Sequence, residues 1–143
     1  MVTVDAEGER LKLACVNWYG AHMEDMVVNG LDRQPIQFIA DTIAELGFNC
    51  VRLPWALDTL FLDPVIKEER LSANTELVGG TAMDLLDAVV EALTKAEVIT
   101  ILNNHVSTAQ WCCHPEDGLW YTDKVTSHLP ISHTISFVNI RYN

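Results

Sequence analysis

Basic residues are scarce in this chain. Its 143 residues include 9 lysines and arginines against 20 aspartates and glutamates, which gives a formal net charge of −11. A surface of that sign repels phosphate backbones and anionic lipid headgroups, so we expect neither nucleic acid nor a membrane as a partner. Neutral polymers such as polysaccharides remain compatible with it.

Long apolar runs and linkers are missing as well. No stretch is long and apolar enough to span a bilayer, and the first ten residues lack the basic and apolar regions of a signal peptide. There are no internal repeats, low-complexity tracts or linkers rich in Ser, Gly or Pro. Because 49% of the residues are apolar, the sequence indicates one domain with a core, or part of one.

Cysteines are few: Cys15, Cys50, Cys112 and Cys113. An even count fits disulfide bonds in an oxidising compartment, but four cysteines are also ordinary in a reduced cytosolic protein. Their pairing and the compartment therefore stay open at this point.

His105, Cys112, Cys113 and His114 are the residues around which a metal site could form. Adjacent cysteines do not easily bind the same tetrahedral ion, and the spacing matches no standard zinc pattern. We expect no metal and no other cofactor, and we favour a disulfide role for the Cys112–Cys113 pair, with partners inside or beyond this chain.

Three short apolar runs predict strands, at residues 11–16, 48–53 and 98–102, the second ended by Pro54. The last of these runs is almost continuously apolar, which is typical of a parallel strand buried on both faces.

Two amphipathic segments between these runs predict helices. Apolar residues three or four apart define the first, over residues 35–46, with Pro35 in its first turn and Gly47 as its stop. Thr81 opens the second, and Asp84 completes a capping box ahead of its apolar stripe. Strands that alternate with helices indicate an α/β fold with parallel strands, in which functional groups gather beyond the C-terminal strand ends.

Polar and aromatic residues follow all three predicted strands. All four tryptophans and two of the three tyrosines lie there, with Arg52, Asn104 and His105 among them. Aromatic faces stack on sugar rings, and these polar groups hydrogen-bond hydroxyls, so the pattern favours a saccharide site. The simpler interpretation of each tryptophan alone is that it closes the end of the core.

Three blocks that contain these residues resemble glycoside hydrolase family 5, in the family's order: residues 16–20, 47–55 and 101–107. Residues 110–121 resemble the third-strand loop of a cellulase-like eukaryotic subgroup. The resemblance covers about residues 3–122 and implies a (β/α)8 barrel, of which this chain holds about three βα units. It also implies a secreted hydrolase of O-glycosidic bonds in β-linked polysaccharides, monomeric when complete.

The resemblance also implies roles for particular residues. Arg52 matches the arginine that supports the catalytic nucleophile, and a guanidinium there keeps a carboxylate ionised and correctly turned. His105 matches the histidine that contacts the sugar at the cleavage subsite. Asn104 lies beside it in the sequence, and Trp18 and Trp111 are expected as sugar platforms.

The catalytic glutamates of the family have no match here. The acid/base glutamate follows the fourth strand in an Asn-Glu pair, which this sequence lacks, and the nucleophile follows the seventh. We therefore expect a truncated family 5 domain at 1–122, inactive as written, and a divergent tail at 123–143. The alternative is a non-catalytic carbohydrate-binding remnant. Two structural expectations follow: Arg52 and His105 lie at the same end of the sheet, and the outer strands leave unpaired edges that make the isolated chain marginally stable.

Overall fold

The structure is a computed structural model that describes residue 4, residues 7–111 and residues 138–139. The expectations for Cys112, Cys113 and His114, and most of the expected tail, lie outside these residues.

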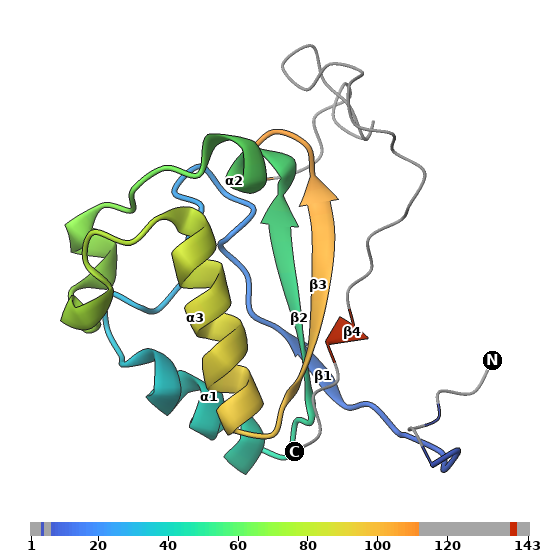
Figure 1. The fold of residues 1–143 in the computed structure, drawn as a ribbon. Coiled ribbons are helices and arrows are strands. Elements are labelled where there is room, and N and C mark those ends of the chain that lie inside the picture. Colours follow the sequence, from blue (N-terminus) through green and yellow to red (C-terminus); the bar gives the residue numbers. More distant parts are fainter. Residues whose placement is uncertain (1–3, 5–6, 112–137, 140–143) are drawn as a thin grey trace.

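Three neighbouring parallel strands form most of the described sheet. β1 (Cys15–Asn17) pairs with β2 (Cys50–Ala56), and β2 pairs with β3 (Ile99–Val106). A short fourth strand, β4 (Val138–Asn139), runs antiparallel along the outer edge of β3 (Figure 1). The expected parallel α/β arrangement is confirmed. The outer edge of β3 was expected to be unpaired. It is instead paired with β4 at two positions, Thr100 and Ile101.

The helices cover only one face of this sheet (Figure 1). They are α1 (Ile36–Glu45), α2 (Leu57–Leu62) and α3 (Ala82–Lys95), with two 3-10 turns, η1 (Glu68–Leu71) and η2 (Thr75–Leu77). No helix of the described residues covers the opposite face, which would face the inside of a closed barrel.

Both predicted helices are confirmed, although the first is one residue shorter at each end than predicted. Pro35 precedes the first turn of α1, and Gly47, just beyond its end, has a φ of 86°. At α3 the Thr81 hydroxyl accepts from the Asp84 N–H while the Asp84 carboxylate accepts from the Thr81 N–H. This reciprocal capping box satisfies two N–H groups that would otherwise lack partners.

β1 is shorter than predicted because a side chain replaces part of its ladder. The Asn49 Oδ1 accepts from the Ala14 N–H at 2.8 Å, and the Asn49 Nδ2 donates to the Lys12 carbonyl at 2.9 Å. These bonds satisfy the Ala14 N–H and the Lys12 carbonyl without a neighbouring strand, and regular pairing begins only at Cys15.

β2 continues through Pro54, where the sequence predicted its end. N–H and C=O groups alternate between the two sides of a strand, and the Arg52 carbonyl accepts from the Trp18 N–H on the β1 side. Pro54 faces that same side, but β1 has already ended at Asn17. The missing N–H of proline therefore costs no ladder bond, as at an edge position.

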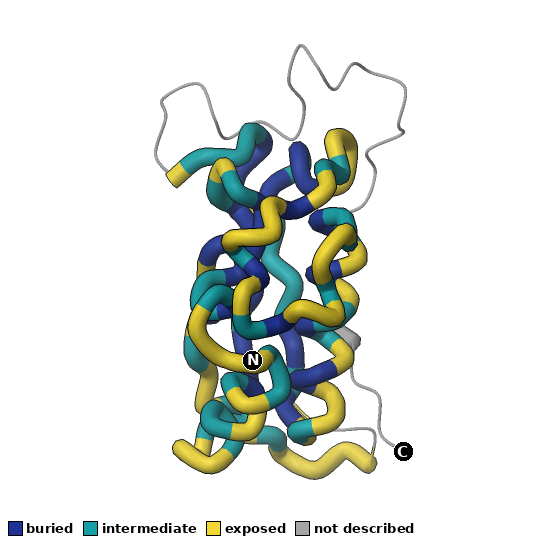
Figure 2. Tube along the Cα trace, turned by 90° about the vertical axis from the view of Figure 1, so that its left-hand side faces the viewer, coloured by how far each residue is buried: buried dark blue, intermediate teal, exposed yellow. Residues whose placement is uncertain are grey.

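The core lies between the sheet and the helices, and Figure 2 shows buried stretches along the middle of the molecule. Its fully buried leucines come from every layer: Leu31, Leu53, Leu71, Leu85 and Leu93. This single cluster joins the long β1–α1 connection to the strands and to α3.

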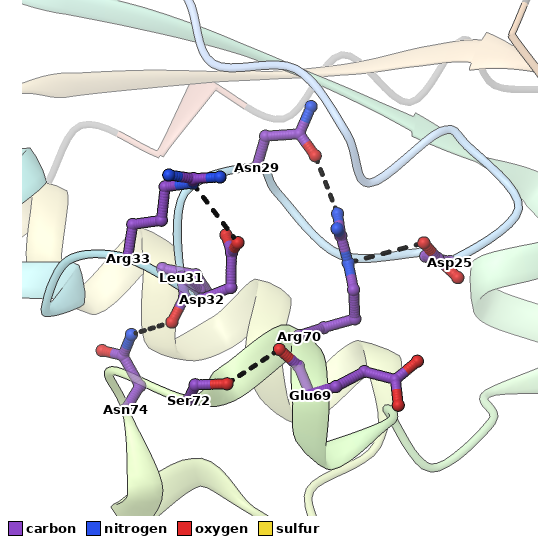
Figure 3. Close-up of polar contacts among 9 residues, drawn as sticks. All are labelled: Asp25, Asn29, Leu31, Asp32, Arg33, Glu69, Arg70, Ser72 and Asn74. Carbon is purple, nitrogen blue, oxygen red and sulfur yellow. Dashed lines mark hydrogen bonds and ion pairs between the residues drawn. The ribbon is translucent and has the colours of Figure 1, made fainter.

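Polar contacts fix that connection to the segment before α3 (Figure 3). Asn74 is fully buried; its Nδ2 donates to the Leu31 carbonyl at 2.7 Å and the Gln34 carbonyl at 2.9 Å, and its Oδ1 accepts from the Ile36 N–H at 2.7 Å. Nearby, Arg70 pairs with Asp25 and donates to the Asn29 side chain. Asn74 thus satisfies the first turn of α1 from a distant part of the chain.

We predict that Asn74→Ala lowers the free energy of unfolding by about 2–4 kcal/mol, because one buried N–H and two carbonyls lose their partner. Urea unfolding followed by tryptophan fluorescence measures the loss. The matched control is Ser72→Ala, whose exposed hydroxyl donates only to the Glu69 carbonyl and whose removal should cost less than about 0.5 kcal/mol. Equal effects of the two substitutions would contradict this role for Asn74.

Candidate active site

Arg52 joins the three parallel strands at the C-terminal end of the sheet. Its guanidinium donates to the Asn103 Oδ1 of β3 at 2.6 Å and approaches the Asn17 Oδ1 of β1 at 3.4 Å. Its Nη2 also lies 3.2 Å from the His105 Nδ1. The expectation that Arg52 and His105 lie at the same end of the sheet is confirmed.

The strand register explains why these side chains lie beside Arg52. Asn17, Arg52 and Ile101 are register partners, so their side chains point to the same face of the sheet. Asn103 lies two residues beyond Ile101 and returns to that face, which the described helices leave open.

Asn104 points to the other face. It is the register partner of Trp55, which packs against the core, and the Asn104 Oδ1 is buried without a hydrogen-bond partner among the described residues. The amide beside Arg52 is therefore Asn103, which the sequence-based set of site residues omitted. The signal was available in the period-2 alternation of Ile101, Asn103 and His105.

His105 is the extra residue of a bulge. Trp55 pairs with Asn104 and Ala56 pairs with Val106, so β2 has no residue opposite His105. Arginine can only donate, so the contact with Arg52 requires the His105 Nδ1 to accept. The ring is then the neutral tautomer with its proton on Nε2.

A disulfide bond joins Cys15 of β1 to Cys50 of β2. The sequence left the pairing of the four cysteines open, and this bond pairs two of them. The two cysteines are register partners and precede Asn17 and Arg52 by two residues each, so the bond lies on the same face of the sheet. It closes a separation of 35 residues, for which chain entropy gives about 4 kcal/mol of stabilisation. The bond thereby fixes the register that places Asn17 beside Arg52.

His22 is a second histidine of this site, which the sequence-based set of site residues omitted. Its ring is only 4% exposed and packs edge-on against His105, with ring centroids 4.9 Å apart and an angle of 82°. Burial and the neighbouring His105 lower the pKa of His22, with a smaller effect of Arg52, although the Pro54 and Trp111 carbonyls act in the opposite direction.

The two tryptophans expected as sugar platforms differ in exposure. Trp111 is 64% exposed, and its ring lies 6.2 Å from Tyr19 and 6.5 Å from His22. Trp18 is only 7% exposed and lies in the core, where its indole N–H donates to the Asn29 carbonyl at 2.9 Å. A ring buried in this way offers no open face for a sugar, so Trp18 has the core-closing position of the simpler interpretation.

Two acidic side chains that follow β1 and β2 are held by other groups. Asp25 pairs with Lys67 and Arg70, and the buried Asp58 accepts from the Ala109 N–H at 3.0 Å. None of the ion pairs within the described ranges involves Arg52. Over the same ranges there is no group of three or more His, Cys, Asp or Glu side chains that could hold a metal ion.

Comparison with known proteins agrees with this geometry. Residues 4–133 match the family model for cellulase (glycosyl hydrolase family 5). The catalytic domain of the major endoglucanase from Xanthomonas campestris superposes with a TM-score of 0.75 at 29% identity, over 87% of this chain and 35% of that domain. An endocellulase from Pyrococcus horikoshii, solved in complex with cellotetraose, gives a TM-score of 0.69 at 25% identity, over 82% of this chain and 31% of its own.

Curated relatives give the same family. A glycosyl hydrolase 5 family protein from Chamaecyparis obtusa is 41% identical over 130 residues, and the major extracellular endoglucanase of Xanthomonas campestris is 30% identical over 123. The matches cover 80% and 86% of this chain but only 23% and 25% of those proteins. The chain belongs to glycosyl hydrolase family 5, and its fold is the N-terminal part of the family's barrel. The helices of the described residues include none long and apolar enough to cross a membrane.

The lowered pKa of His22 predicts a stability loss in acid. Above the ordinary value of 6.5 the ring is neutral in both states; below it, the unfolded chain takes up a proton that the folded chain binds less well. The free energy of unfolding should therefore fall between about pH 7.5 and pH 5.5. His22→Phe removes this contribution, so urea unfolding at both pH values should show a smaller loss for the variant. Equal losses would show that His22 does not titrate in this way.

Proposed function

We propose that this chain forms the N-terminal, sugar-binding part of a glycoside hydrolase that acts on O-glycosidic bonds of β-glycans. The observation that carries the proposal is the cluster of Arg52, Asn103 and His105 at the C-terminal end of the sheet. This end is where catalytic groups of (β/α)8 barrels lie. The cellotetraose bound by the Pyrococcus endocellulase supports a β-glucan oligosaccharide as the ligand class.

Each group of the cluster has a chemical task in this proposal. The His105 imidazole contacts the sugar at the cleavage subsite, and Trp111, with Tyr19 beside it, offers a ring for stacking on a sugar. The partners of Arg52 among the described residues are neutral, so its positive charge remains available to a carboxylate. Arg52 would hold the nucleophilic glutamate of a complete barrel ionised and correctly oriented.

Cleavage with retention requires two carboxyl groups about 5 Å apart across the glycosidic bond. The sequence contains no Asn-Glu pair, and two of the described carboxylates near this end, Asp25 and Asp58, are held by other groups. We therefore propose that the 143-residue chain binds glucan without hydrolysing it. In this proposal residues 1–122 form the partial catalytic domain and 123–143 a divergent tail.

The proposed location is outside the cell, with a monomer as the complete enzyme. The Xanthomonas relative is named as extracellular, and the Cys15–Cys50 disulfide is the kind of bond that persists in oxidising compartments. The charge of −11 fits a neutral glycan better than nucleic acid or anionic lipid.

The alternative proposal is a carbohydrate-binding protein without a catalytic role. A chimaera separates the two proposals: residues 1–111 replace the matching part of the Xanthomonas endoglucanase domain, on which this chain superposes. A hydrolase origin predicts turnover of β-glucan by the chimaera and a loss of about 100-fold or more with Arg52→Ala. A folded chimaera that binds cellotetraose without turnover would favour the alternative.

For the chain itself we predict binding without turnover. Cellotetraose should bind, while hydrolysis of β-glucans and β-mannans should stay at background. Arg52→Ala or His105→Ala should weaken binding about tenfold, because each removes a charge-assisted or direct hydrogen bond. Arg33→Ala is the matched control, because Arg33 is exposed and pairs only weakly with the neighbouring Asp32.

Titration calorimetry measures the binding of cellotetraose, and a reducing-sugar assay measures hydrolysis. Clear turnover by the 143-residue chain would show that carboxylates other than the family glutamates perform the chemistry. Binding that is indifferent to both site substitutions would remove Arg52 and His105 from the site.

A further inference from the structure

The first turn of α2 contacts the loops that follow the two neighbouring strands. α2 comes directly after β2 and lies at the C-terminal end of the sheet (Figure 1). The hydroxyl of Thr59, which is fully buried, donates to the Ala21 carbonyl in the loop after β1 at 3.1 Å. Its neighbour Asp58, only 6% exposed, contacts the loop after β3. This turn therefore joins the segments that follow all three parallel strands.

Asp58 binds the loop after β3 at two points. Its N–H donates to the Ser107 carbonyl at 3.1 Å, and its Oδ2 accepts from the Ala109 N–H at 3.0 Å. The first bond uses an N–H that a helix leaves free in its first turn, and the second is made to a carboxylate oxygen, which is a stronger acceptor than a neutral group. Because the two bonds reach alternate residues, they fix the direction of the loop as well as its distance from α2.

The same loop carries Trp111. The Gln110 N–H donates to the His22 carbonyl at 3.0 Å, and Trp111 is the next residue. Its ring is 64% exposed and lies edge-on to Tyr19, with centroids 6.2 Å apart. A ring that stands mostly in solvent has few packing contacts, so the backbone that carries it chiefly determines its place.

We propose that Asp58 is a positioning residue, which holds residues 107–110 so that the Trp111 ring lies beside Tyr19, where the sugar stacks in the proposed function. Without the carboxylate the Ala109 N–H loses its acceptor, and the loop turns toward solvent to regain one. The consequence for glucan binding rests on the proposed function, but the consequence for the loop does not.

The competing interpretation is that Asp58 only stabilises the fold, and Asp63 is the matched control for it. Asp63 makes the same kind of bond at the other end of α2, where its Oδ1 accepts from the Met83 N–H of α3 at 2.9 Å. Asp63→Ala should lower stability and leave the loop after β3 in place, whereas Asp58→Ala should release it. Asp58→Asn keeps an oxygen that accepts from the Ala109 N–H, so it should retain the loop.

The test reads the loop in the 143-residue chain without ligand, by amide hydrogen exchange and by proton–proton NOEs. In the unaltered chain the Gln110 N–H should exchange slowly and the Trp111 ring should show NOEs to Tyr19. Trp111→Phe assigns the indole signal among the four tryptophans. Asp58→Ala should speed Gln110 exchange about tenfold or more and remove these NOEs, while Asp58→Asn and Asp63→Ala should keep both properties.

Cellotetraose titrations then measure the consequence for the ligand. Asp58→Ala should weaken binding about threefold to tenfold, as for the loss of one stacking contact. Asp58→Asn and Asp63→Ala should bind within about twofold of the unaltered chain.

The proposal is overturned if the unaltered chain lacks slow Gln110 exchange or the NOEs between Trp111 and Tyr19, a result that does not depend on whether Asp58→Ala folds. It is also overturned if Asp58→Ala leaves the loop or the binding unchanged, if Asp63→Ala releases the loop equally, or if Asp58→Asn behaves like Asp58→Ala. A chain that shows the expected loop behaviour but does not bind cellotetraose would refute the proposed function and leave the role of Asp58 in the loop intact.

Discussion

The guanidinium of Arg52 must be satisfied where three strands meet, and much of the site follows from that requirement. A partly buried cation needs several acceptors, and Asn17, Asn103 and His105 provide them from the strands on both sides. These acceptors meet only if the strands are in one register, which the ladder and the Cys15–Cys50 disulfide fix. One charge thus links the sheet register to the tautomer of His105.

The helical layer supports the same end of the sheet indirectly. The connection between β1 and α1 carries His22 and supplies the Asn29 carbonyl that holds Trp18. Asn74 and Arg70 bind that connection from the segment before α3 (Figure 3). Polar contacts distant from the candidate site therefore hold the connection that carries His22. The opposite sheet face, which no described helix covers, is the face that the remaining strands of a closed barrel would enclose.

Much of this was predictable from sequence, and the misses have physical causes. Apolar periodicity and the Thr81–Asp84 capping box located both helices, because these signals are local. Pro54 was wrongly expected to end β2, since only the early end of β1 makes a proline harmless there. The choice of Asn104 over Asn103 ignored strand alternation. His22 could not be predicted, because its approach to His105 depends on how the loop after β1 folds back.

The central claim is that the C-terminal end of this sheet, around Arg52, binds a β-glucan oligosaccharide. The most direct measurement is an NMR map of the 143-residue chain titrated with cellotetraose, over the backbone and the Trp, His and Arg side chains. The account predicts that the largest shift changes cluster at Tyr19, Arg52, Asn103, His105 and Trp111. Changes confined to α1 and α3, or none at saturating sugar, would contradict it.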